Sequence, residues 1–437
     1  MNNKFKSLLV LLLALVIISP MFAQGAKENV KQEEGPVTLT FWSWLPTTTQ
    51  WDNMLEEFES ENPEIKINFT RTEQNDYFEK IQVAMASGTG PDIFGLSTGA
   101  PVNRYATFAE PMDTLADKYM PGWDDVISSS AVEQCVSDKG VLVGMPMLVV
   151  GVNYMLYNQT LLEECGVAKV PTNNDEMLAA AKKIRAKGYM PVAMGAADDW
   201  QNIDWFVNVS NQFEPGAVYE AEKGTRSFTD KCFIDTANAW ASLFTDGIFE
   251  DGALGVVTYP DARDQYFFDR NAVFFATGSW HVGPTSPKNL EIQGTKIQVN
   301  KDVLGMTNFP QMGPNEFRAT TGVDLVLGVN KDCKEKEAAA KFIEFMSMGD
   351  GQQQWANWLQ GSPVATTITY QGEIDGKLQQ QSIDTLNRLN SNAVGSRTIK
   401  YAELSKALSV AMQNVAAGAD AEVEFAEVQK VSESIER

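Results

Sequence analysis

The residues best suited to chemistry in this chain are tryptophans that stand beside acidic residues. Two segments hold such pairs, Asp198-Asp199-Trp200 and Asp204-Trp205, in a stretch expected to follow a strand. An indole ring offers a flat apolar platform, and a carboxylate accepts hydrogen bonds from hydroxyl groups. The combination suits a ligand with apolar C–H faces and many hydroxyls, such as a sugar. It also suits an organic cation, which indole faces attract. We expect Asp199, Trp200 and Asp204 to contact the ligand.

Catalytic and metal-binding patterns are scarce. His281 is the only histidine, so a Ser-His-Asp triad would have to use it, and a zinc site with several histidines is excluded. The four cysteines, Cys135, Cys165, Cys232 and Cys333, show no C-x-x-C spacing. They allow three disulfide pairings, among which the sequence does not decide, and we favour buried free thiols. We therefore predict a binding protein that is not an enzyme and holds no metal or cofactor.

The elements that position these side chains alternate between strand and helix. Residues 37–42 and 65–69 alternate in polarity like strands, and residues 91–94 form a turn into a buried strand. Between them, residues 51–58 and 77–85 place apolar side chains on one helical face. This β-α-β-α-β order predicts an α/β fold with a doubly wound, mostly parallel sheet. Trp51 and Trp240 fall in apolar stripes, and we expect both in the core.

Two further tryptophans stand where such sheets bind ligands. Trp42 ends the first predicted strand, and Trp44 lies in the loop that follows. Ligands of open α/β sheets bind outside the carboxyl ends of the strands, so we expect Trp42 and Trp44 at the site. The apolar stretch 140–157 is longer than a usual strand, and we expect it to bend near Pro146.

The amino terminus predicts export. Lys4 and Lys6 precede an apolar run over residues 8–18, and Ala23-Gln24-Gly25 offers small residues for cleavage. We read residues 1–25 as a signal peptide and the polar residues 26–36 as a flexible leader. The predicted location is the periplasm or extracytoplasmic space. The net charge of −22 disfavours nucleic acid and anionic lipid as partners. The length suggests two lobes, and we expect a monomer.

Several short segments together resemble the bacterial extracellular solute-binding proteins of sugar importers. Each is weak alone, but their order and spacing cover nearly all of residues 37–437. They are LTFWS (39–43), ASGTGPDI (86–93), GMP (144–146) with YN (157–158), FATGSW (275–280) and GSP (361–363).

The resemblance implies a two-lobed fold whose doubly wound mixed sheets are joined by crossing hinge strands. It implies a ligand in the cleft between the lobes, closure by a hinge, and docking of the closed form onto ABC permease subunits in the membrane. Crossings are expected at residues 144–150, 306–313 and near 349–351. The first lobe would then comprise residues 37–148 plus 313–349, and the second lobe residues 149–312 plus 350–437.

The resemblance also adds candidate ligand contacts. Trp280 matches the family's cleft aromatic, in the turn Gly278-Ser279-Trp280, where Gly278 lets the backbone approach a ligand closely and Ser279 is a further candidate contact. Other candidates are placed by family position or by following a strand. They are Thr98, Gly322, Asp324 and Trp355.

Two alternatives to a sugar receptor remain. A glycan hydrolase would need a pair of carboxyl groups, which so acidic a chain could supply, although no motif isolates one. The same fold could instead hold a polyamine or another non-sugar solute. An anionic ligand would favour an arginine clamp, and Arg71, Arg104 and Arg263 stand alone in the sequence.

Overall fold

The computed structural model describes residues 35–292 and 299–437. The predicted signal peptide and all but the last two residues of the predicted leader lie outside this part of the chain. None of the helices in this part of the chain combines the length and the apolar character of a membrane-spanning segment. Cys135, Cys165, Cys232 and Cys333 are buried free thiols.

The described strands join into one mixed sheet in the order β2-β1-β3-β8-β4-β6-β5. β1 pairs in parallel with β2 and β3, and β5 pairs in parallel with β6. The long strands β4 and β8 pair antiparallel to each other. The bounds are β1 Val37–Ser43, β2 Ile65–Arg71, β3 Ile93–Leu96, β4 Met145–Asn158, β5 Met190–Ala193, β6 Ala272–Gly278, β7 Leu304–Asn308, β8 Thr320–Val329, β9 Ser362–Pro363 and β10 Gly395–Ser396.

The predicted β-α-β-α-β start is confirmed by β1, β2 and β3 with two intervening helices. A capping box begins the first of these helices, because Thr47 accepts from the Gln50 backbone and the Gln50 side chain accepts from the Thr47 backbone. The α-helices are α1 Thr48–Glu61, α2 Gln74–Ser87, α3 Ala100–Tyr105, α4 Met112–Tyr119, α5 Trp123–Val126, α6 Ser129–Glu133, α7 Gln159–Glu164, α8 Asn174–Ala186, α9 Asp199–Phe213, α10 Ala217–Glu222, α11 Lys231–Thr245, α12 Pro287–Ile292, α13 Lys336–Met348, α14 Asp350–Asn357, α15 Lys377–Ser391, α16 Ala402–Ala416 and α17 Ala421–Ser434.

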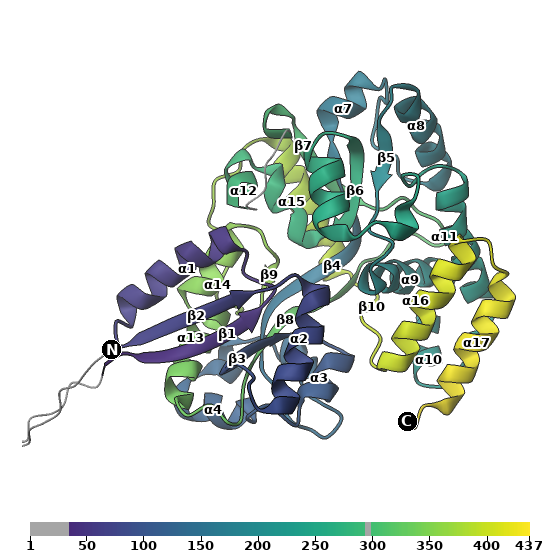
Figure 1. Cartoon of the computed structure of the whole chain (residues 1–437). Helices are drawn as coiled ribbons and strands as arrows, with labels where there is room; N and C mark the ends of the chain where they lie inside the picture. Colours follow the sequence, from purple (N-terminus) through teal and green to yellow (C-terminus); the bar gives the residue numbers. More distant parts are fainter. Residues whose placement is uncertain (1–34, 293–298) are drawn as a thin grey trace, which may run out of the picture. The chain divides into compact units, whose positions relative to one another are not determined.

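β4 belongs to both halves of the sheet (Figure 1). Its first half pairs with β8, and its second half pairs with β6 and β7. The register shifts between Pro146 and Val149, which confirms the expected irregularity near Pro146. Such a shift interrupts the hydrogen-bond ladder locally and bends the strand.

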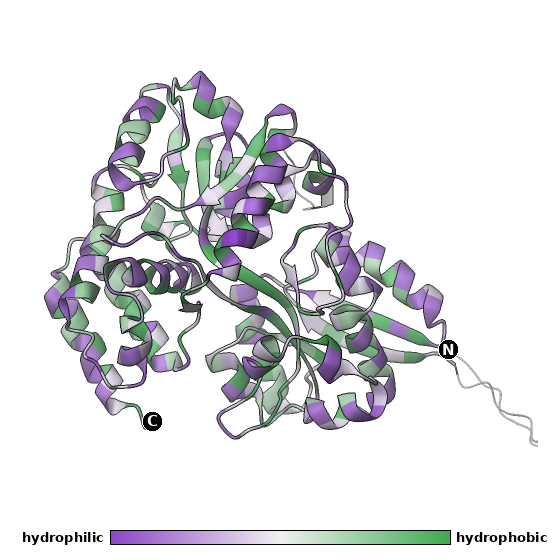
Figure 2. Cartoon of the chain, turned by 180° about the vertical axis from the view of Figure 1, so that it is seen from behind, coloured by the Kyte–Doolittle hydropathy of each residue, from purple (hydrophilic) through white to green (hydrophobic). Residues whose placement is uncertain are grey.

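Two large apolar clusters lie on either side of β4. The first core cluster draws on residues 39–148 and 323–364, and the second on residues 155–309 and 399–428. Trp51 belongs to the first and Trp240 to the second, so both predicted core positions are confirmed. Figure 2 shows hydrophobic residues concentrated along the central strands, whereas the helices carry hydrophilic stripes. The first cluster continues to Val364, beyond the third crossing predicted near residues 349–351.

Candidate functional site

A cavity with about 620 Å³ of empty space, its open mouth included, lies where segments from both halves of the sheet meet. One part of its wall follows β1 and β2 and includes Asp324 of β8 and Gln360 after α14. The other part comes from the start of α9, the π-helical segment Thr258–Phe268, the turn after β6, and Arg397. The wall comprises Trp44, Leu45, Thr47, Arg71, Gln74, Trp200, Tyr259, Arg263, Trp280, His281, Asp324, Gln360 and Arg397.

The loop after β1 brings Trp44 to the wall. Trp44 packs against Tyr77 and Phe78 of α2, with ring centroids 5.5 and 5.6 Å apart. The Gln50 side chain, held in the capping box of α1, donates a 2.8 Å hydrogen bond to Gln360. The carboxyl end of β1, the start of α1 and the segment after α14 are thereby fixed to one another.

Three aromatic rings form the opposite part of the wall, and we call them the cavity aromatic cluster: Trp200, Tyr259 and Trp280. The rings of Trp200 and Tyr259 lie nearly parallel, with centroids 6.2 Å apart, and Trp280 lies 6.1 Å from Trp200. The Trp280 indole N–H donates a 2.9 Å hydrogen bond to the Tyr259 hydroxyl. Because this bond and the packing restrain the rings, the wall offers preformed apolar faces.

Gly278 and Ser279 position Trp280 rather than leaving room for another molecule. A Cβ at residue 278 would lie 1.9 Å from the Trp280 ring, so only glycine allows the indole to fold back over the strand end. The Ser279 hydroxyl accepts a 2.9 Å hydrogen bond from the Gly151 backbone N–H of β4. The turn is therefore attached to the strand shared by both halves of the sheet.

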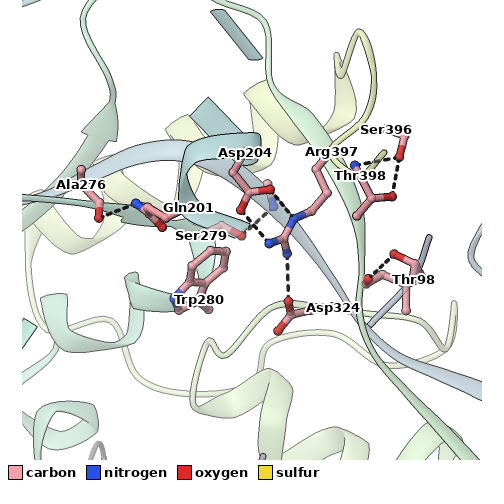
Figure 3. A network of polar contacts seen from close by, with 12 residues as sticks. Thr98, Gln201, Asp204, Ala276, Ser279, Trp280, Asp324, Ser396, Arg397 and Thr398 are labelled. Carbon is pink, nitrogen blue, oxygen red and sulfur yellow. Dashed lines mark hydrogen bonds and ion pairs between the residues drawn. The ribbon is translucent and has the colours of Figure 1, made fainter. Parts of the chain in front are cut away.

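Arg397 is the centre of a buried ion-pair network (Figure 3). Its Nε and Nη2 bind both oxygens of Asp204 at 3.0 and 2.7 Å, and its Nη1 binds Asp324 at 2.8 Å. The guanidinium also lies 5.3 Å from the centroid of the Trp280 ring. Burial by itself would lower the pKa of Arg397, but the two carboxylates hold it above its usual value. Burial raises the pKa of Asp204 to about 6, against the pull of Arg397.

Two more arginines reach the cavity. Arg71, the last residue of β2, pairs with Glu73 at 2.8 Å. Arg263 pairs with Asp264 through Nε and Nη2, and its guanidinium lies 4.7 Å from the Tyr259 ring centroid. Arg71 and Arg263 stand alone in the sequence, yet folding brings both to one cavity with Arg397, whereas Arg104 does not line it.

His281 also lines the cavity, in its neutral form. Burial, and then the charge of Arg263, lowers the pKa of His281 well below its usual range. Its Nδ1 lies 2.6 Å from the Thr277 hydroxyl. A neutral imidazole fixed in this way supplies hydrogen-bonding capacity without charge.

The predicted contact residues fall into three groups. Four of them line the cavity: Trp44, Trp200, Trp280 and Asp324. Asp204, Gly278, Ser279 and Gly322 lie just behind the wall, where Gly322 approaches Arg397. The remaining four are not wall residues: half-buried Trp42; Thr98, which donates to the Val323 carbonyl; Asp199, which binds Lys406 and Ser409; and Trp355, which lies in the first core cluster.

The residues that sequence reasoning did not select include all three arginines of the wall, Gln74, Tyr259 and Gln360. Arg71 had a usable signal, because it ends β2 beside β1, and the rule that selected Trp42 applies equally to the neighbouring parallel strand. Arg263 and Arg397 lie in segments whose local sequence indicates no site.

Known proteins similar to this chain in sequence or in structure are solute-binding and sugar-binding proteins. The family model of bacterial extracellular solute-binding proteins matches residues 43–353. The multiple sugar-binding protein of Streptococcus mutans is 23% identical over 320 residues, which cover 71% of each chain.

The structure resembles that of a chitin oligosaccharide binding protein, with a TM-score of 0.75 and 20% identity over 91% of this chain and 98% of the other. It also resembles maltose-bound MalE3 of T. maritima, with a TM-score of 0.74 and 22% identity over 91% and 99%. The fold shared with these structures is the predicted two-lobed α/β fold.

Proposed function

This chain belongs to the bacterial extracellular solute-binding proteins, and on that premise we propose that it binds a carbohydrate for an ABC importer. The observation that carries the proposal is the cavity aromatic cluster, which shares one cavity with Trp44. Indole and phenol rings suit the apolar C–H faces of a sugar, and the polar wall residues suit its hydroxyls. Two of the similar structures are named for the oligosaccharide or maltose that they bind.

We propose that binding closes the two lobes about β4. Arg397 supports this view, because it joins Asp204 of α9, which packs in the second core cluster, to Asp324 of β8, which packs in the first. A ligand with higher affinity for the closed form would shift the hinge equilibrium toward it. The continuation of the first core cluster to Val364 leads us to extend the first lobe past the predicted limit at residue 349.

The other expectations belong to the same proposal. The chain would be exported by its signal peptide, act outside the cytoplasm as a monomer, present the closed form to ABC permease subunits, and bind no nucleic acid. The binding role requires no catalytic residue, metal or cofactor.

The two alternatives receive less support. A polyamine would meet three arginines in the described wall, where Asp324 is the single acidic residue. A hydrolase would need two available carboxyl groups, but Asp324 of the described wall and Asp204 behind it both bind Arg397.

A thermal-shift screen against mono- and oligosaccharides tests the proposal. A sugar that binds only the native state raises the melting temperature, and calorimetry should then give an affinity near micromolar, about 8 kcal/mol. Spermidine serves as the cation control, and a reducing-end assay detects hydrolysis. Release of new reducing ends beyond one equivalent, or stabilisation by spermidine and by no sugar, would contradict the proposal.

A further inference from the structure

We infer that the sugar bound by this protein carries a carboxylate, which is held by Arg71 together with Arg263. This inference rests on the proposed function and narrows its ligand class from sugars in general to acidic sugars. The described wall carries three arginines, Arg71, Arg263 and Arg397, in a chain of net charge −22. Each guanidinium is bound by at least one carboxylate, and a ligand would meet the donors that these pairs leave unused.

Arg397 does not supply the free positive charge. All three of its nitrogens bind Asp204 or Asp324, and its side chain is 9% exposed. Two carboxylates therefore balance its charge and occupy its three nitrogens. The two other guanidinium groups of the wall each pair with one carboxylate only.

Arg71, a wall residue, keeps one donor that no other described residue binds. Its Nη1 binds Glu73, but its Nε is buried and has no hydrogen-bond partner. Among the described residues it is the only charged group with such a buried, unpartnered atom. A buried donor without a partner is unfavourable, most of all on a charged group. A carboxylate that displaced the atoms now covering this edge of the guanidinium would pair it.

Arg263 lies in the same cavity and is more enclosed, with a side chain 13% exposed. Its pair with Asp264 uses Nε and Nη2, which leaves Nη1 outside the pair. Burial pulls the pKa of Arg263 down, but Asp264, Tyr259 and Glu73 hold it above its usual value. Glu73 is thus within electrostatic reach of both arginines.

Glu73 is the carboxylate to which Arg71 donates. It precedes α2 as the N-cap residue, yet its side chain makes no capping bond, and it is 49% exposed. Its carboxylate is held by Arg71 and can turn toward solvent without breaking a helix cap. The carboxylate of an acidic sugar would take its place at Arg71, while the rings of the cavity aromatic cluster contact the sugar faces.

The test compares charged and neutral sugars of matched shape. Disaccharides of galacturonate, glucuronate, mannuronate and guluronate are titrated calorimetrically beside their methyl esters and neutral hexose counterparts. We expect a uronate to bind most tightly, at least tenfold better than its ester, and to weaken as salt rises. If a neutral sugar binds most tightly, the acidic preference is wrong and the proposed function stands. If no sugar of either kind binds, the proposed function fails as well.

Single substitutions test which side chains bind the carboxylate of the sugar. Arg71→Gln should weaken uronate binding at least tenfold and change binding of a neutral counterpart less than threefold. Glu73→Gln removes the competing carboxylate and should strengthen uronate binding severalfold, a gain that damage to the fold cannot imitate. Arg104→Gln, at an exposed position of α3 outside the cavity, is the matched control and should change neither. Equal losses for charged and neutral sugars in Arg71→Gln, or no gain in Glu73→Gln, would overturn the inference.

Discussion

Two groups of aromatic rings in this protein share the helix α9 but have different surroundings. Trp200 belongs to the cavity aromatic cluster, whereas Trp205 packs against Trp240 in the second core cluster, with centroids 4.8 Å apart. Residues five apart on a helix point roughly 140° away from each other, so one helix serves both groups. The core rings meet mainly other rings, including Phe249. The cavity rings meet a hydroxyl and two guanidinium groups.

Residue type alone therefore does not separate a binding surface from a core. Tryptophan serves in both, but the core rings pack mainly against other rings, whereas the cavity rings line a cavity beside guanidinium groups. Mutations in the core group should therefore change stability, and mutations in the cavity group should change affinity.

The largest effect is expected from the core group. Trp240→Ala removes a fully buried ring and its 3.0 Å hydrogen bond to the Met412 carbonyl. We expect a loss of about 3–5 kcal/mol in the free energy of unfolding, measured by urea denaturation. The fraction that remains folded should bind the best sugar of the screen with unchanged affinity. A loss below about 1 kcal/mol, or a specific loss of affinity, would remove the distinction between the groups.

A second core prediction concerns Glu250, which follows Phe249 and is 3% exposed. Burial raises the pKa of Glu250 to about 8, and both its oxygens accept from the Met194 backbone N–H. Between the ordinary carboxyl pKa and pH 8 the folded protein binds more protons than the unfolded chain, so stability falls as pH rises.

Glu250→Gln should therefore be more stable than the parent protein at pH 8, by about 4 kcal/mol, and equally stable near pH 4. Thermal unfolding across this pH range measures the difference. Glu56→Gln, at an exposed position of α1, should leave the difference between pH 4 and pH 8 unchanged. A Glu250→Gln profile parallel to that of the parent protein would show that the carboxyl group titrates as it does in the unfolded chain.

The cavity group is tested most directly at Trp280. Trp280→Ala removes a ring that is 8% exposed and lines the cavity, so we expect affinity to fall at least tenfold, about 1.4 kcal/mol. Calorimetry with the best sugar of the screen measures it. Trp280→Phe keeps an apolar face and should lose less. Unchanged affinity in Trp280→Ala would place Trp280 with the core rings.

The smallest effect is expected at the hydroxyl of Tyr259. Tyr259→Phe keeps the ring that stacks on Trp200 but leaves the Trp280 indole N–H without its acceptor. We expect affinity to fall a few-fold, which corresponds to the roughly 1 kcal/mol that a hydrogen bond contributes. A loss as large as that of Trp280→Ala would mean that the hydroxyl contacts the sugar itself.

Local sequence patterns were sufficient to predict a large part of the secondary structure and packing of this protein. The alternation of residues 37–42 and the apolar helical stripe around Trp51 predicted β1, α1 and their packing, because periodicity records which side chains face the core. The rule for carboxyl strand ends selected Trp44, which lines the cavity. The short segments of residues 39–363 were sufficient to identify the family.

Tertiary structure decided which side chains share the cavity. Arg71, Arg263 and Arg397 are separated by well over a hundred residues each, and no local spacing connects them. Asp199 and Trp200 are adjacent in sequence, yet Asp199 turns to Lys406 of α16 while Trp200 joins the cavity. The physical reason is that periodicity encodes a residue's orientation within its own element. The wall of a cavity depends instead on how distant elements pack against one another, and the sequence of any one element does not contain that information.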